Sequence, residues 1–245
     1  MDAIKEGRAW LKDTLRDAVD SSATEQAKGV PMPPFEKEPV GLSLIQLPEV
    51  DFHTKEGPSL GEVLTQRASR RRFAQKPLTL YELAFLLKAS AGAHQGRGTG
   101  WRFTPSAGNR HSEETLVAVL RVEGLPQGIY RYLAGRHCLD FQRSVPNLSE
   151  EVAVAARHQL FVARAGVVFF WTVVPHRTKW RYSGASAKVI ALDLGHVCQN
   201  LYLACEYLGL GTCAIAAYDQ KRSDDLLGVD GQEEFTAYLA PVGTL

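Results

Sequence analysis

The densest group of side chains that could bind an anion lies between residues 67 and 77. This segment contains five cationic residues and no acidic one. Like charges at this density repel one another unless an anion lies among them. Arginine guanidiniums and a serine hydroxyl donate the hydrogen bonds that a phosphate accepts, so this segment is a candidate phosphate-binding element. A solvated basic face or a nucleic-acid-binding patch accounts for the same run equally well, because charge runs are common on protein surfaces.

The turn at residues 105–110, with the sequence PSAGNR, is a second candidate binding element. Its small residues leave backbone N–H groups free to approach a flat ligand, and the Asn109 amide could hydrogen-bond the polar edge of that ligand. Ser106 and Gly108 belong to the same turn. Taken alone, this stretch favours an ordinary turn without a ligand.

Residues 209–214, GLGTCA, match the spacing of a dinucleotide-binding fingerprint. That fingerprint follows a strand and opens a helix, whereas this one follows a long apolar helix and precedes a β-prone run, so we reject a Rossmann fold. Gly209 and Gly211 instead end the helix, because glycine readily adopts the left-handed conformation found there. The sequence also contains no motif of serine hydrolases, Walker-type nucleoside triphosphatases or zinc proteases.

These candidates must be positioned by a long helix, which we predict over residues 189–208. The helix is apolar on almost every face, which predicts that it is buried on every face. Asp193, His196 and Gln199 interrupt the apolar run and argue against a membrane span. A second subunit is the simplest cover for the side of the helix that its own domain leaves open, so we expect a homodimer.

The composition is that of an ordinary globular protein, with 45% hydrophobic residues and a formal net charge of +1 over 245 residues. The small net charge provides no general attraction to nucleic acid or to a membrane surface. The four cysteines lack CxxC spacing, so we expect no metal site, and buried free thiols in a reducing cytoplasm. No signal-peptide pattern precedes the first predicted helix, which also favours a cytoplasmic location.

The chain divides into two regions, 1–58 and 59–245. The first contains a predicted helix at 3–19 and a proline-rich extended arm, which could wrap its own domain or a partner's and includes a short strand at 42–47. The second mixes helices and strands without regular βαβ alternation, which favours an α+β fold. Besides the long helix, we predict helices at 60–68, 81–91, 149–158 and 220–227, and strands at 114–122, 129–133, 138–141, 166–174, 212–217 and 235–241.

Taken in order, five motifs resemble the nitroreductase-like flavoprotein superfamily. They are RASRRRF, PLTLYELAFLLKAS, PSAGN, DLGHVCQNLYLACEYLGLGTCAIAAYD and YLAPVG. The resemblance covers about residues 60–243. Within the superfamily, the order is most similar to the SagB-type dehydrogenases, the branch that includes thiazoline and oxazoline oxidases of peptide biosynthesis. The resemblance implies an FMN-dependent homodimer with a mostly antiparallel central sheet flanked by helices. The long helix would lie at the dimer interface, and the cofactors would lie there too.

The resemblance also implies which residues bind FMN. Arg67, Ser69 and Arg71 would hold its phosphate and ribityl groups, Ser106, Gly108 and Asn109 would lie along the isoalloxazine, and Gly209, Gly211 and Thr212 would pass over the ring. The turn residues could come from either subunit. When bound, FMN carries a hydride at its N5 atom, and the protein supplies placement and hydrogen-bond donors around the ring.

One departure from the family concerns the candidate catalytic residues. The azoline-oxidising members carry a Lys-Tyr pair before the long helix, and the matching dipeptide here is Arg181-Tyr182. Arginine does not release a proton near neutral pH, so it cannot replace a lysine base. Tyr182 could still donate a proton, and Arg181 could still hold an anion. We expect the run KWRY to be non-helical and Tyr182 to face the flavin.

Two further departures concern cations. An arginine that many members carry between this pair and the long helix is Ala185 here. Many relatives also add a basic phosphate ligand just beyond the glycine that matches Gly243, where this sequence has Thr244 and Leu245. The cations that could substitute are Lys188, Lys221 and Arg222.

The expected function is that of an FMN-dependent oxidoreductase acting on a small or peptidic substrate, with NAD(P)H as a candidate hydride donor. The altered Lys-Tyr pair supports an alternative, a flavin-binding partner protein of a biosynthetic complex without turnover of its own. A third reading takes residues 67–76 as an RNA-binding surface.

Overall fold

The computed structural model describes residues 2–17, 19–41, 44–53, 57–94, 96–97 and 100–245. Its centre is a seven-stranded sheet in the order β1-β4-β3-β2-β5-β7-β6, in which every neighbouring pair is antiparallel. The strands are β1 (Leu44–Gln46), β2 (Glu113–Val119), β3 (Gly128–Leu133), β4 (Cys138–Arg143), β5 (Val167–Val173), β6 (Leu210–Thr212) and β7 (Phe235–Thr244). The expected α+β fold with an antiparallel sheet is confirmed.

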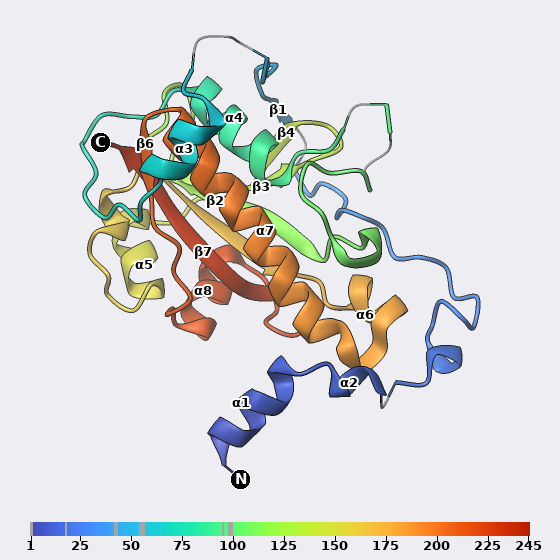
Figure 1. Cartoon of the computed structure of the whole chain (residues 1–245). Coiled ribbons are helices and arrows are strands. Elements are labelled where there is room, and N and C mark those ends of the chain that lie inside the picture. The colour runs from blue at the N-terminus through green and yellow to red at the C-terminus, as the bar shows by residue number, and fades with distance from the viewer. Residues whose placement is uncertain (1, 18, 42–43, 54–56, 95, 98–99) are drawn as a thin grey trace.

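Helices cover both faces of this sheet (Figure 1). The described helices are α1 (Ala3–Leu11), α2 (Thr14–Asp17), α3 (Leu60–Gln66), α4 (Leu80–Ala91), α5 (Leu148–Ala155), α6 (His176–Tyr182), α7 (Ser186–Tyr207) and α8 (Gln220–Leu227). One core cluster joins α4 and α7 to one face, and a second joins α5 and α8 to the other. Strand β5 is buried along its whole length because it is apolar on both sides and lies between these layers.

Three predicted elements differ from the structure. The N-terminal helix is interrupted after Leu11 and continues as the single turn α2, because Lys12 is extended. The run KWRY (179–182), expected to be non-helical, belongs to α6, which begins directly after Pro175; proline is well tolerated where a helix starts. Of the strand expected at 212–217, only Thr212 belongs to β6, because pairing with β7 ends at that residue.

The proline-rich arm runs along the domain and contributes to its sheet. Its backbone forms two hydrogen bonds with Trp180 of α6. Gln26 N donates to Trp180 O, and the Trp180 indole donates to Val30 O. Strand β1 pairs with β4, while residues 42 and 43 of the predicted strand lie outside the described residues. The division of the chain at residue 58 remains a prediction.

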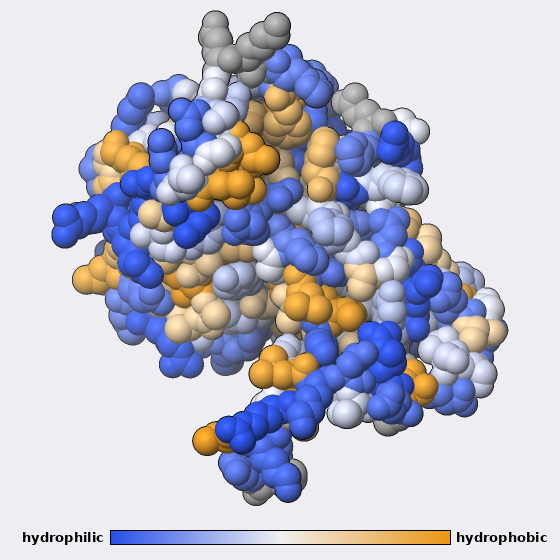
Figure 2. Space-filling view, in the orientation of Figure 1, coloured by the Kyte–Doolittle hydropathy of each residue, from blue (hydrophilic) through white to orange (hydrophobic). Residues whose placement is uncertain are grey.

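Helix α7 is buried on one face only within a single chain. Ile190, Leu194 and Leu201 pack in the core, whereas the opposite face is exposed. Leu192 on that face is 56% exposed. Figure 2 shows apolar side chains gathered in two places on this side of the molecule, beside α3 and over the lower part of α7. Burial of the helix on every face is therefore not achieved by the chain alone.

The four cysteines are free and buried, as expected. No grouping of His, Cys, Asp and Glu among the described residues could hold a metal ion. In the same part of the chain, no helix combines the length and the apolar character that crossing a bilayer requires.

Candidate functional site

The structure brings the arginine-rich segment against β6. Ser69 forms a parallel bridge with Thr212, and Arg70 N donates to Thr212 O at 2.8 Å. The hydroxyls of Ser69 and Tyr202 are hydrogen-bonded at 2.9 Å, and the Arg67 guanidinium lies 5.2 Å from the centre of the Tyr202 ring. Arg67, Ser69, Tyr202 and Thr212, together with Arg71 two residues after Ser69 in the sequence, are called the basic cluster below. Tyr202 was not predicted from the sequence, since it lies in a helix that was treated only as a buried scaffold.

The chemistry of this donor set fits a phosphate. Arg70 is paired with Glu206 of α7, with 3.0 Å between Nη2 and Oε1. Among the described residues, no carboxylate forms an ion pair with Arg67 or Arg71. Arg71 is exposed and Arg67 is partly buried. Guanidiniums without a carboxylate partner, near a serine hydroxyl, are donors of the kind that a phosphate accepts.

The glycines after α7 place backbone next to this cluster. Gly209 has a φ of 69°, the left-handed conformation expected at the end of the helix. A Cβ on Gly211 would lie 2.6 Å from the end of the Leu245 side chain, so a larger residue there would require that side chain to move. The Thr212 hydroxyl donates to Pro241 O at 3.0 Å. Its side chain therefore already has a partner, and Thr212 could contribute to ligand binding only through where it places the chain.

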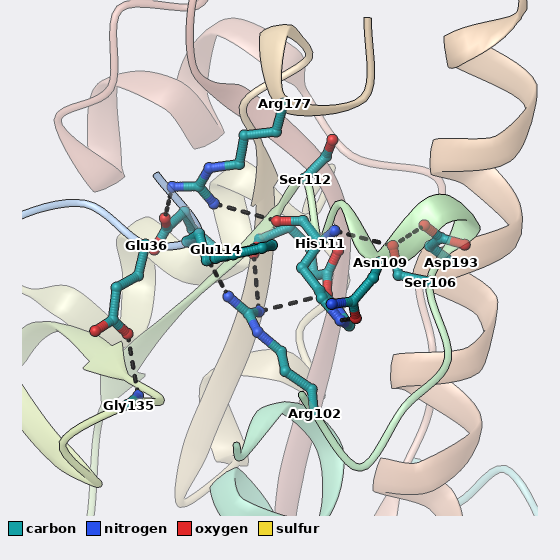
Figure 3. Close-up of polar contacts among 12 residues, drawn as sticks. Glu36, Arg102, Ser106, Asn109, His111, Ser112, Glu114, Gly135, Arg177 and Asp193 are labelled. Carbon is teal, nitrogen blue, oxygen red and sulfur yellow. Dashed lines mark hydrogen bonds and ion pairs between the residues drawn. The ribbon is translucent and has the colours of Figure 1, made fainter. Parts of the chain in front are cut away.

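The PSAGN turn is attached to the other end of α7 through Asp193 (Figure 3). The Ser106 hydroxyl donates to Asp193 Oδ2 at 2.7 Å, and Ala107 N donates to Oδ1 at 3.2 Å. His111 N in turn donates to Ser106 Oγ at 2.9 Å. Asp193 is 4% exposed, and this burial raises the pKa of its carboxyl group. The sequence does contain a signal for Asp193, because an acid inside an apolar helix needs hydrogen-bond partners.

The backbone of this turn is strained. Gly108, Asn109 and His111 all have positive φ, between 45° and 57°, and such values are unfavourable for residues other than glycine. Side-chain contacts hold them in place: His111 Nε2 lies 3.0 Å from Asn109 Oδ1, and Nδ1 lies 3.1 Å from Glu113 Oε1. Ser106, Gly108, Asn109, His111 and Asp193 are called the turn cluster below.

Buried ion pairs support the turn cluster from the sheet. Glu113 lies 3.4 Å from Arg102. Burial raises the pKa of Glu113, but the contacts with His111 and Arg102 together lower it by more. The pKa of Glu113 therefore lies below its usual value of 4.5. At the next residue, Glu114 pairs with Arg177 and with Arg131, the latter at 3.2 Å. Figure 3 shows Arg102, Glu114 and Arg177 converging beside His111. These pairs were not predicted, because their members are scattered over β2, β3, α6 and the loop before the PSAGN turn.

The structure places the candidate catalytic pair beside the turn. A Cβ on Gly108 would lie 2.7 Å from both the Tyr182 hydroxyl and Arg181 Cδ, so the absent side chain permits this approach. The Arg181 guanidinium lies 5.7 Å from the centre of the Tyr182 ring. Both residues, with Ala185, line a cavity of about 400 Å³ between α6 and the N-terminal arm.

The two clusters are at different positions along α7. Asp193 and Tyr202 are nine residues apart on this helix, a separation of about 14 Å along its axis. Of the cations considered as substitutes, Lys188 is 4.0 Å from Asp13 and Lys221 is 2.6 Å from Asp225. Neither contact links these lysines to the basic cluster.

The comparison with known proteins agrees with the fold described above. The model of the Nitroreductase family matches residues 64–244. A Methanocaldococcus jannaschii protein provisionally named as a nitroreductase, MJ1384, is 35% identical over 203 residues, which cover 81% of this chain and 95% of that protein. The trifolitoxin-processing protein TfxB of Rhizobium leguminosarum bv. trifolii is 34% identical over 112 residues, which cover 43% of this chain and 30% of TfxB.

A crystal structure from Ralstonia eutropha JMP134, also provisionally named as a nitroreductase, is similar in fold. Its TM-score is 0.70 at 27% sequence identity, and the match covers 87% of this chain and 96% of the other. The likeness therefore extends beyond the motifs to nearly the whole of that structure.

Proposed function

The chain belongs to the nitroreductase family, and on that premise we propose that it is an FMN-dependent oxidoreductase of the SagB-type branch. The observation that carries the proposal is the contact of Ser69 and Arg70 with Thr212, which joins two segments that the family resemblance assigns to FMN. Arg67, Arg71 and the Ser69 hydroxyl would hold the phosphate, with Tyr202 fixing the orientation of Ser69. Bound FMN would supply hydride transfer at N5.

The turn cluster would present its polar atoms to the flavin ring. Asp193 fixes Ser106 and Ala107, and His111 fixes the Asn109 amide, so the turn need not rearrange when a ligand arrives. Such preorganisation lowers the entropic cost of binding. Tyr182, beside Gly108, would donate or accept the substrate proton, and Arg181 would hold an anion.

A homodimer completes this proposal. Leu192 on the exposed face of α7 is flanked by the small residues Ala191 and Gly195, which allow another helix to approach closely. A second copy would cover this face, and each FMN site would draw on both chains. The separation of the two clusters along α7 supports shared sites.

The similarity to TfxB, which is named for processing trifolitoxin, supports the SagB-type branch, and with it a substrate of peptidic character. The same similarity, with arginine in place of the family's lysine, favours the second candidate function, a flavin-binding partner in a biosynthetic complex. In that case the chain would bind FMN but not turn over alone.

A spectrum and two half-reactions test the proposal. We expect the purified protein to carry bound FMN, to be reduced anaerobically by NADH or NADPH, and to be reoxidised by a nitroaromatic compound or oxygen. Bound flavin without either half-reaction would favour the partner role. Absence of flavin, together with RNA binding that depends on Arg70 and Arg72, would reject both.

Substitution of the catalytic pair tests the branch. Tyr182→Phe should retain flavin and slow the substrate half-reaction by roughly 100-fold, because general acid–base catalysis contributes about that much. Arg181→Lys restores the family's lysine and should raise dehydrogenation of a thiazoline test peptide. If neither variant differs from the parent with any acceptor, a general flavin reductase is the better description.

A further inference from the structure

The cavity next to the candidate catalytic pair is positively charged. Its lining residues include Arg16, Arg181 and Tyr182, and none of its described lining residues is acidic. One wall comes from the N-terminal segment, including Arg16 and Val19, and the other from the end of α6. Segments about 165 residues apart in sequence therefore meet around this space.

The two arginines of the lining are not equivalent. Arg16 already pairs with Asp13, with 2.8 Å between Nε and Oδ2, and both side chains are half-exposed. Arg181 has no carboxylate partner among the described residues; its guanidinium lies 5.7 Å from the centre of the Tyr182 ring, and its side chain passes beside Gly108. An anion entering the cavity would therefore find an unpaired guanidinium on Arg181.

A third guanidinium adds to the positive charge from behind the wall. Arg110 is 6% exposed, and it donates to the carbonyl oxygens of Gly108 and Asn109, both at 3.0 Å, rather than to a carboxylate. It lies 5.1 Å from the ring centres of Phe35 and Trp180. Burial, and then the nearby charge of Arg181, lowers the pKa of Arg110. A negative charge beside Arg181 would relieve this repulsion.

The size and lining of the cavity restrict the ligand. A volume of about 400 Å³ is within the range of small-molecule sites. Val19, Ala27 and Ala185 provide apolar surface next to the charged groups. A planar carboxylate matches the fork of a guanidinium, and the apolar surface suits a short carbon skeleton. The basic cluster, the proposed phosphate site, is at the other end of α7.

We propose that this cavity is a substrate subsite in which Arg181 binds a carboxylate group. The ligand class is a small organic acid or the C-terminal residue of a peptide. Its place in the reaction rests on the proposed function: Gly108, in contact with Arg181 and Tyr182, belongs to the turn assigned to the isoalloxazine. A carboxylate held by Arg181 would place the neighbouring carbons of the substrate beside that turn. The N-terminal segment acts as a wall of the subsite.

A matched pair of probes tests the proposal without any redox step. N-acetylalanine and its neutral analogue N-acetylalaninamide would be titrated into the full-length protein by calorimetry, with and without bound flavin. We expect the acid to bind about 10-fold more tightly than the amide, in line with a charge-assisted hydrogen bond. Arg181→Gln should abolish this preference, Arg181→Lys should retain part of it, and Arg16→Gln should weaken it less.

Lys179→Gln is the control, because it removes one positive charge from the same helix at an exposed position that does not line the cavity. It should leave the preference intact. Equal binding of acid and amide, no binding of the acid, or a preference that survives Arg181→Gln overturns the proposal. Flavin content and reduction by NAD(P)H are measured on the same samples. An acid preference in a protein without flavin chemistry would reject the proposed function and keep the subsite.

Discussion

The two clusters at the ends of α7 are built in opposite ways. In the basic cluster, Arg71 is exposed, and neither it nor Arg67 forms an ion pair with a carboxylate in the described parts of the chain. In the turn cluster, Asp193 is buried and accepts hydrogen bonds from both the side chain and the backbone of the turn. The arginines of the basic cluster thus lack carboxylate partners, whose place an anionic ligand could take, whereas the turn cluster has its hydrogen-bond partners within the chain.

The difference has a physical cause. Burying an unpaired charge costs several kcal/mol of free energy. Cations whose partner is a bound anion must therefore stay in contact with water when that anion is absent. A left-handed backbone at Asn109 and His111 is unfavourable, so it persists only where other contacts hold it. Substitutions in the basic cluster should therefore change ligand affinity, whereas substitutions in the turn cluster should change the stability of the fold.

The largest effect is expected for flavin affinity. Arg67→Ala with Arg71→Ala should weaken FMN binding by about 3–6 kcal/mol, because each charge-assisted bond contributes roughly 1.5–3 kcal/mol. The thermal stability of the flavin-free protein should not change. Fluorescence titration with FMN and differential scanning calorimetry measure the two quantities. The matched control is Arg136→Ala, which removes an exposed arginine paired only with Glu38 at 3.5 Å. Unaltered FMN affinity in the double variant would contradict the assignment.

The next largest effect is on folding. Asp193→Ala should lower the free energy of unfolding by about 3 kcal/mol, since it leaves Ala107 N–H and the Ser106 hydroxyl without their acceptor. Urea denaturation of the flavin-free protein measures the change. Asp225→Ala, which removes an exposed carboxylate on α8, should change it by less than about 0.5 kcal/mol. Equal losses in the two variants would remove the contrast between the clusters.

A third effect concerns the assembly that would bring the two clusters into one site. Leu192→Glu should weaken dimerisation by about 2 kcal/mol per chain, the free energy of burying one leucine, while the monomer stays folded. Leu160→Glu is the control, because Leu160 is 74% exposed on a different part of the surface. Sedimentation equilibrium distinguishes the variants. Leu201→Glu is unsuitable as an interface test, since Leu201 is buried in the core of its own chain and its replacement should unfold the protein.

The smallest effect is a pH dependence. Because burial raises the pKa of Asp193 above its usual value of 3.8, the folded state binds its proton more tightly than the unfolded state does. The contribution of this group to stability is therefore present at low pH and is lost as the pH rises through the folded-state pKa. Asp193→Asn should cost more stability at about pH 3.5 than at pH 7. Denaturation at both pH values, with Asp225→Asn as control, measures this, and a cost that grows with pH would contradict the assigned cause.

Much of the fold could be predicted because its determinants are local. The apolar run of β5 and the glycine that ends α7 are readable within a few residues, and both elements occur where predicted. Helix α6 was missed because seven residues after Pro175 carry too little periodicity to distinguish a short helix from a loop. The length of β7 was underestimated because its end pairs with β6.

The candidate site could be predicted only in part. The contact of Ser69 with Thr212 agrees with the family resemblance. The two residues are, however, separated in the sequence by most of the domain, so no local pattern predicts their contact. Asp193 was noticed only as an interruption of an apolar helix, and its partner Ser106 is 87 residues away. The wall that the N-terminal segment provides beside Arg181 had no signal in the sequence.

The sequence by itself determined the class of fold, the long helix, the cationic segment and the turn, since apolar periodicity, charge density and small residues act over short stretches of chain. Only the tertiary structure decided which of these groups meet. It set the basic cluster and the turn cluster at separate positions on α7, left Arg181 without a carboxylate, and exposed one face of the helix. The physical reason is that a buried polar group pairs with whichever group lies next to it in the packed core. Which residues lie next to each other there depends on how the whole sheet is assembled.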